Sequence, residues 1–201
     1  MHWFRCLMAV VTTTVLATKL SEEEETRLRR IDADPQTGFA AAVLVDDAAL
    51  AHTAQILPLG PDGKLIGASD AALQTRAALK NLSEALKLAG TDASQLVKLN
   101  VYLSSDDVVV AVQKVLREQL ASIAKPAVSF VSGQLAKPGV LVALDAVAAV
   151  PGKGPVDVSN RSLAGDQQGR TTLVSVLPRG GVVYISGQAE KGETLADCTQ
   201  K

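Results

Sequence analysis

Apolar and polar residues alternate along the chain in a way that predicts strands and helices between residues 39 and 150. Two apolar runs, 39–45 and 48–57, flank the pair Asp46-Asp47, which is typical of a turn. The segment GPDG at 60–63 forms a second turn. We therefore expect residues 39–57 to form a hairpin-like pair of strands.

Residues 69–90 (SDAALQTRAALKNLSEALKLAG) carry apolar residues at the spacing of one helix face. Ser69 or Asp70 is placed to cap the start of this helix, and Gly90 is placed to end it. The same periodicity assigns Gln74 to the opposite, polar face of the helix. This segment is the strongest helix signal in the chain.

The rest of this region continues the alternation of strands and helices. The pattern predicts a strand at 95–103, a second helix at 106–122 that ends before Pro126, and strands at 127–133 and 140–150. The resulting order is β-β-α-β-α-β-β. It predicts an α/β fold in which two helices pack on one face of a single mixed β-sheet.

Composition excludes several classes of function. Hydrophobic residues make up 47% of the 201 residues and aromatic residues only 3%, so the core must consist of Ala, Val and Leu. The net charge of -1 offers no bulk attraction to nucleic acid. Cys6, Cys198, His2 and His52 have no spacing typical of a metal site or a thiol nucleophile. We therefore expect no metal site, no thiol catalysis and no nucleic-acid partner.

The first residues resemble an export signal. Arg5 precedes an uncharged stretch from Cys6 to Thr18, a length that suits a signal peptide better than a membrane span of about 20 residues. We interpret residues 1–18 as a signal peptide, which predicts a periplasmic or secreted protein. The alternatives are a mis-assigned start or a buried strand, and the protein would then be cytoplasmic.

Two polar segments bound the central region: 19–38 is interpreted as a charged linker and 151–170 as a Pro/Gly/Ser-rich linker. Residues 171–201 then restart the earlier pattern, since VYISGQ at 183–188 matches LAHTAQ at 50–55 and aligns Gln188 with Gln55. This predicts the truncated start of a second, similar domain in a fragment of a longer protein; the alternative is a coincidental likeness of two hairpins. In such an orphaned repeat, the apolar face of residues 174–189 is expected either to be uncovered, which would expose Val176, Val182 and Tyr184, or to be covered by the first domain.

Four motifs occur in the order QTRAALKNLSEALKLAG, LVKLNVYL, KPAVSFV and VLVALDAVA. Together they resemble the Rid family (YjgF/UK114-type, also called endoribonuclease L-PSP). The resemblance implies a chorismate-mutase-like α/β fold for residues 39–150. It also implies homotrimers or pseudo-trimers with ligand clefts between neighbouring subunits or domains. The implied activity is hydrolysis of enamine or imine intermediates, the 2-imino acids, to ketoacids and ammonia without metal or cofactor.

The family's charged site residues are replaced in this sequence. The arginine that follows Pro-Ala in the family corresponds to Val128, and the first carboxylate of its VEIEA-like strand corresponds to Ala143. By family position, the resemblance implies that the cleft is lined by Val128, Ser129, Ala143, Gln55, Tyr102 and Gln188. We assign none of them a catalytic role.

Other candidates are better explained as structural. Ser129 and Ser132 have no nearby base in the sequence, Lys125 is expected to be solvated, and Asp145 and His52 are expected to have structural roles. Three hypotheses remain. The chain is a relative of imine deaminases whose first site is inactive and needs the second domain, a non-catalytic domain that binds a small metabolite, or a structural oligomerisation domain.

Overall fold

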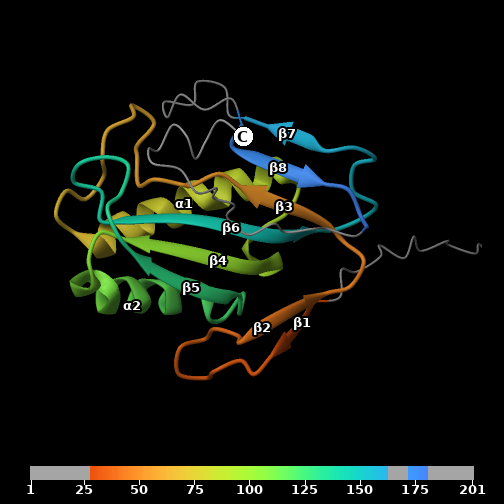
Figure 1. Ribbon diagram of the computed structural model, residues 1–201, viewed down its shortest axis with the longest axis horizontal. Helices are drawn as coiled ribbons and strands as arrows, with labels where there is room; N and C mark the ends of the chain where they lie inside the picture. Colours follow the sequence, from red (N-terminus) through yellow and green to blue (C-terminus); the bar gives the residue numbers. More distant parts are fainter. Residues whose placement is uncertain (1–27, 163–171, 181–201) are drawn as a thin grey trace, which may run out of the picture.

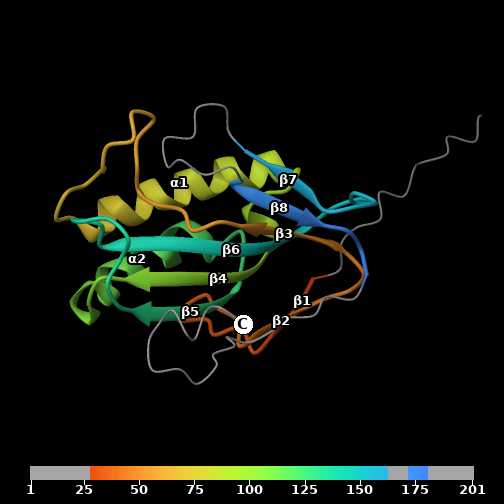
Figure 2. The same ribbon diagram turned by 45° about the horizontal axis from the view of Figure 1, so that its top comes forward.

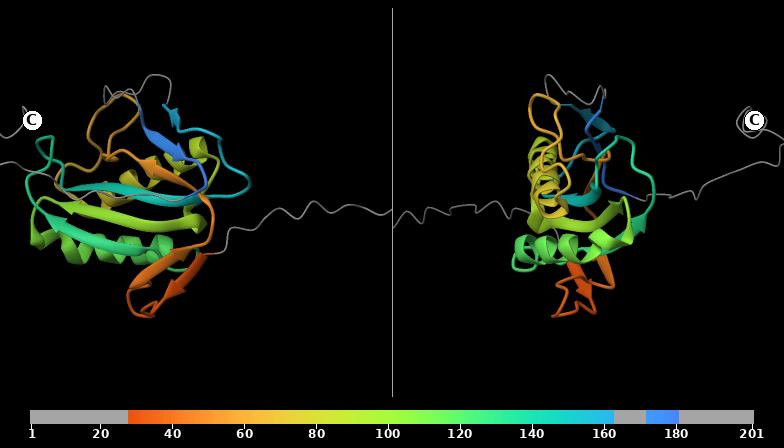
Figure 3. Two further views of the ribbon diagram at one scale, coloured as in Figure 1. Left: turned by 45° about the vertical axis from the view of Figure 1, so that its right-hand side comes forward. Right: turned by 90° about the vertical axis from the view of Figure 1, so that its left-hand side faces the viewer.

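The computed structural model describes residues 28–162 and 172–180. In this part, a six-stranded mixed sheet in the order β5-β4-β6-β3-β8-β7 forms the centre (Figure 1). Both α-helices of the described part lie on the same face of the sheet (Figure 3), which confirms the predicted α/β architecture. The elements are α1 (Ala71–Ala89), α2 (Val109–Leu120), β3 (Ala49–Thr53), β4 (Leu96–Leu103), β5 (Ala127–Ser132), β6 (Val142–Val150), β7 (Ser159–Arg161) and β8 (Val174–Leu177). None of the helices in the described ranges has the length and apolar character to cross a membrane.

Both ends of α1 are capped as predicted. The Oδ1 atom of Asp70 accepts a hydrogen bond from the backbone N–H of Leu73 at 2.9 Å, which satisfies one of the free donors of the first turn. Gly90 ends the helix in the left-handed conformation with φ 80°, which glycine adopts without strain. The apolar stripe of the helix, which includes Leu82 and Leu86, is buried against the sheet.

Gln74 departs from the prediction because it is fully buried rather than on the polar face of α1. Its Nε2 atom donates hydrogen bonds to the carbonyl oxygens of Gly67 at 3.1 Å and Gly139 at 2.9 Å. Its Oε1 atom accepts the backbone N–H of Leu141 at 2.7 Å. The amide is buried because two loops that are distant in sequence satisfy its polar atoms, which the helical periodicity does not reveal.

The main core lies between the sheet and the two helices. Leu99, Val101 and Leu103 of β4 alternate toward the helices and pack with Val112 and Leu116 of α2. β5 runs parallel to β4, whereas the other pairs in the sheet are antiparallel. The second helix begins with a 3-10 turn at Asp106–Val108 and ends at Leu120, close to the predicted bounds of 106–122.

The hairpin predicted for residues 39–57 is wrong. β2 (Ala42–Val45) pairs with β1 (Leu28–Ile31) in a separate two-stranded ribbon, and Figure 2 shows this ribbon beside β5. β1 also places a strand inside the predicted linker 19–38. β3 instead pairs with β6 and β8. The physical reason is that both hydrogen-bonding edges of β3 are occupied by strands from later in the chain, so β2 cannot pair with it.

The C-terminal part of the described chain belongs to the same sheet. β7 lies inside the predicted linker 151–170, and β8 pairs with β3. Val176 is only 1% exposed because it packs with Ala49 and Ala51. The expectation that it is uncovered is therefore wrong, and the alternative, that the first domain covers it, holds for this residue. Val182, Tyr184, Gln188 and the signal peptide 1–18 lie outside the described residues. The division into a complete and a truncated domain stays a prediction.

Candidate functional site

A polar network lies on the face of the sheet opposite the helices. Because Leu99, Val101 and Leu103 point to the helices, the alternate residues of β4, Asn100 and Tyr102, lie on the other face. The Oη atom of Tyr102 donates to Oδ2 of Asp145 at 2.6 Å, and Nδ2 of Asn100 donates to Oδ1 at 2.8 Å. Each carboxylate oxygen of Asp145 therefore already accepts a hydrogen bond from the protein.

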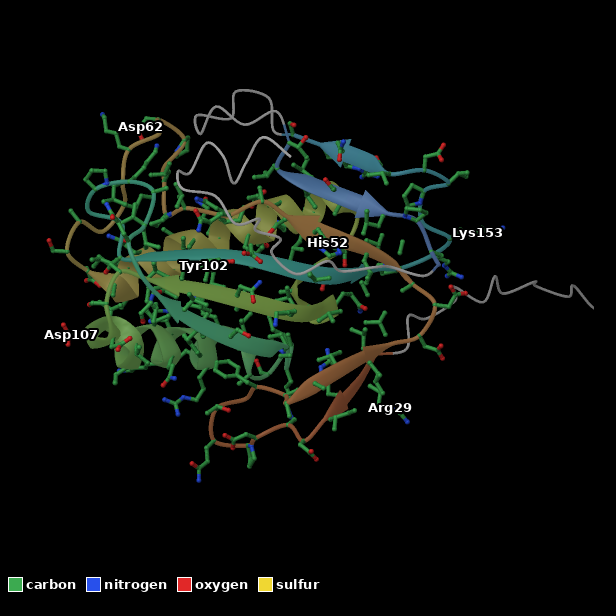
Figure 4. All side chains as sticks on the ribbon, in the orientation of Figure 1. Arg29, His52, Asp62, Tyr102, Asp107 and Lys153 are labelled. Carbon is green, nitrogen blue, oxygen red and sulfur yellow. The ribbon has the colours of Figure 1, made fainter. Side chains whose placement is uncertain are left out.

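The network shifts the pKa of two groups. The hydrogen bond from the phenol of Tyr102 to Asp145, with burial and the negative charge of that carboxylate, raises the pKa of Tyr102 to about 12. Burial lowers the pKa of His52 on β3, although the charge of Asp145 acts in the opposite direction. His52 on β3 and Tyr102 on β4 lie on the two strands that flank β6 (Figure 4). At neutral pH the phenol of Tyr102 is therefore protonated and the imidazole of His52 is mostly uncharged.

Val128 lies on the helix side of β5. It is aligned with Leu99 in the parallel β4–β5 ladder, is half-buried, and packs with Phe130 against the main core. An aliphatic side chain in this place offers dispersion contacts and no positive charge. Nothing at position 128 can therefore pair with a carboxylate.

Ala143 lies on the opposite face from Val128 and is fully buried. It forms a small apolar cluster with Leu57, Leu59 and Val140, against which Tyr102 packs. A methyl group in such a cluster cannot polarise a water molecule. Packed side chains therefore close the position to which the family resemblance assigns a carboxylate.

The remaining predicted residues are only partly brought together. Ser129 is half-buried, and its Oγ atom accepts a hydrogen bond from Nζ of Lys98 at 3.2 Å. Gln55 is half-buried and directly precedes Ile56, which pairs with Leu144. Thus Ser129, Ala143 and Tyr102 share the face opposite the helices, whereas Val128 lies on the other side of the sheet. Gln188 is outside the described residues.

Sequence reasoning missed Asn100 and did not identify the hydrogen-bond partners of Asp145, for which it expected a structural role. Asn100 and Tyr102 are two residues apart on one strand, and Asp145 is the only acidic residue in the apolar run 140–150. A lone acid on a buried strand needs hydrogen-bond donors, and polar side chains on the neighbouring strand are the natural source. Their strand register, which pairs Asn100 with Asp145, required the structure. Within the described ranges, His, Cys, Asp and Glu form no group of three that could hold a metal ion.

Several solved structures of Rid-type proteins are similar to this chain. A Rid-family protein of unknown function, YyfB from Yersinia pestis, is 26% identical with a TM-score of 0.52, over 61% of this chain and 98% of its own. A second one from Yersinia pestis, YyfA, is 26% identical with a TM-score of 0.48, over 56% of this chain and 87% of its own. A YjgF-family protein from Neisseria meningitidis is 21% identical with a TM-score of 0.45, over 62% of this chain and 95% of its own.

The family assignment comes from the sequence match as well as the fold. Residues 31–150 match the family model described as endoribonuclease L-PSP, which is more than half of the chain. No curated protein matches the chain. The mixed sheet with two helices on one face agrees with YyfB. The chain therefore belongs to the endoribonuclease L-PSP family, also called the YjgF/Rid family.

Proposed function

We propose that this Rid-type domain does not hydrolyse 2-imino acids and instead serves as a non-catalytic structural domain of an oligomer. The observation that carries the proposal concerns the two positions where the family resemblance implies charged residues: Ala143 is fully buried in an apolar cluster, and the half-buried Val128 packs against the main core. Neither side chain can hold a substrate carboxylate or orient a water molecule.

Imine hydrolysis has two physical requirements at such a site. A cation must hold the carboxylate of the substrate, and arginine suits this best because its planar fork donates two parallel hydrogen bonds. A polar group must also hold a water molecule beside the imine carbon. A charge-assisted hydrogen bond contributes about 1.5–3 kcal/mol, so loss of the arginine alone weakens transition-state binding by roughly one to two orders of magnitude.

Asp145 does not replace the missing carboxylate. Its two oxygens are engaged by Asn100 and Tyr102, and the phenol of Tyr102 keeps its proton well above neutral pH. A carboxylate held in this way stabilises the sheet and has less capacity to bind and orient a reacting water. This supports a structural role for the network.

The test is an imine-hydrolysis assay with the full chain. An amino-acid oxidase or threonine dehydratase would generate 2-iminobutanoate or 2-iminopropanoate in situ, and ketoacid formation would be followed with and without the protein. We expect no acceleration over the spontaneous rate. A clear, concentration-dependent acceleration would overturn the proposal.

The oligomeric part of the proposal is tested separately. No helix of the described part covers the sheet face that carries Asn100, Tyr102 and Asp145, and these side chains are half-buried. Such a face is suited to pack against a neighbouring copy of the domain. Sedimentation equilibrium should give a homotrimer, or a pseudo-trimer if a second domain contributes. A monomer at all concentrations would refute the oligomeric role and leave the assay result unaffected.

A further inference from the structure

A groove runs between α1 and α2. Its volume is about 420 Å³, and residues of both helices, the 3-10 turn Ala93–Gln95 and the start of β4 line it. This volume falls within the range of small-molecule sites, roughly 300–1,000 Å³. Val128, Ala143 and the Asp145 network do not line it. The groove is therefore separate from the ligand cleft that the family resemblance implies.

The floor and the rim of the groove differ in chemistry. Leu79 and Leu120, which are largely buried, form the floor, and Ile123, which is 52% exposed, presents most of the accessible apolar surface. The rim carries three cations of α1: Arg76, Lys80 and Lys87. They are four and seven residues apart and therefore lie along one side of the helix. The groove thus combines an apolar floor with a row of positive charges, beside which lies one carboxylate, that of Glu84.

Two of these cations have acidic partners and one does not. Arg76 forms an ion pair with Glu118 at 2.7 Å, and Lys87 forms one with Glu84 at 3.3 Å. Both pairs are exposed, and exposed pairs contribute little to stability. Lys80 forms no hydrogen bond or ion pair within the described residues. An anion at the rim therefore meets a free ammonium group between two other cations.

We infer that the α1–α2 groove binds a small organic carboxylate with an apolar body. The apolar body would cover Leu79, Leu120 and Ile123, and the carboxylate would accept hydrogen bonds from the ammonium group of Lys80. The positive charges of Arg76 and Lys87 would add long-range attraction. The inference stands apart from the proposed structural role, because the two rest on different residues and are tested by different measurements.

The experiment measures binding of 4-phenylbutanoate to the full chain by calorimetry at low ionic strength. The alcohol 4-phenyl-1-butanol, which has a similar apolar body and no charge, serves as the ligand control. Lys80→Gln should weaken carboxylate binding about tenfold, the effect of losing one charge-assisted hydrogen bond near the surface. Lys114→Gln is the matched control, since Lys114 is an exposed lysine of α2 that does not line the groove.

A second variant tests the groove by its shape. Ser83 lines the groove and is half-buried, so Ser83→Phe should fill part of the space and abolish binding. Circular dichroism and the melting temperature verify that each variant is folded. If Ser83→Phe does not fold, the comparison of Lys80→Gln with Lys114→Gln still tests whether the groove binds the carboxylate.

Several outcomes would overturn the inference. One is equal affinity for the carboxylate and the alcohol, and another is no binding of 4-phenylbutanoate at all. A third is equal loss of affinity in Lys80→Gln and Lys114→Gln, or no loss in either. Selective loss in Lys80→Gln, with little binding of the alcohol, would support it.

Discussion

Replacing Ala143 with glutamate reintroduces the carboxylate that the family resemblance places at this position. The substitution places a longer side chain among Leu57, Leu59 and Val140, where Ala143 is fully buried. Overpacking of this kind costs about 1–3 kcal/mol. The apolar surroundings also disfavour the charged form of the new carboxyl group.

Burial raises the folded-state pKa of the introduced carboxyl group above its unfolded value of about 4.3. The folded state then binds the proton more tightly than the unfolded state. Its relative stability is therefore retained below about pH 4 and lost as pH rises through the folded-state pKa. A rise of about two pKa units corresponds to a loss of about 2.7 kcal/mol at pH 8.

The assay is urea denaturation of Ala143→Glu and Ala143→Gln from pH 4 to pH 8. The two side chains are almost the same size, so their difference isolates the effect of charge. We expect similar free energies of unfolding at pH 4 and a deficit of about 2–3 kcal/mol for Ala143→Glu at pH 8. A pH-independent difference would show that solvent reaches this position, and the interpretation of a closed site would be wrong.

Three further predictions test other parts of the structure. Gln74→Ala should lower the free energy of unfolding by about 3 kcal/mol, since three hydrogen bonds are lost at about 1 kcal/mol each. Gln113→Ala on α2 is the control, and an equal effect of the two substitutions would contradict the buried role of Gln74. In a Tyr184→Phe background, ultraviolet titration should show the phenol of Tyr102 ionising with a pKa of about 12, and Asp145→Asn should lower that pKa toward 10. The stability associated with this raised pKa is present below pH 10 and is lost as pH rises toward 12, so a titration near pH 10 in the parent protein would refute the network. Val176→Asp should lower the free energy of unfolding by about 3 kcal/mol because it buries a carboxylate beside β3. The control, Val158→Asp, changes a 56% exposed valine and should alter stability by less than about 0.5 kcal/mol. Comparable losses would mean that β8 does not belong to the core.

The elements with local signals were predicted from the sequence. The α1 helix has a sustained apolar period, a capping aspartate at Asp70 and a terminal glycine at Gly90, and all three depend only on residues within the helix and its two ends. β4, β5 and β6 were found at nearly their observed bounds, because alternation with a period of two is also a local property. The Rid resemblance rests on the same segments.

The partner of each strand could not be predicted in the same way. A strand's pattern says which residues share a face, whereas its hydrogen bonds go to a strand that can lie far away in the sequence. β2 therefore looked like the partner of β3, although β1, β6 and β8 occupy the relevant edges. Gln74 looked like a surface residue for a related reason, since the groups that satisfy it belong to two distant loops.

The candidate site, like the fold, depends partly on single residues and partly on tertiary contacts. The sequence alone determined that Val128 and Ala143 carry no charge, and this already argued against imine hydrolysis. Only the tertiary structure decided that Val128 packs on the helix side, that Ala143 is closed in by apolar neighbours, and that Asn100 and Tyr102 both bind Asp145. Charge is a property of a residue by itself, whereas burial and hydrogen bonding are properties of what the fold places around it.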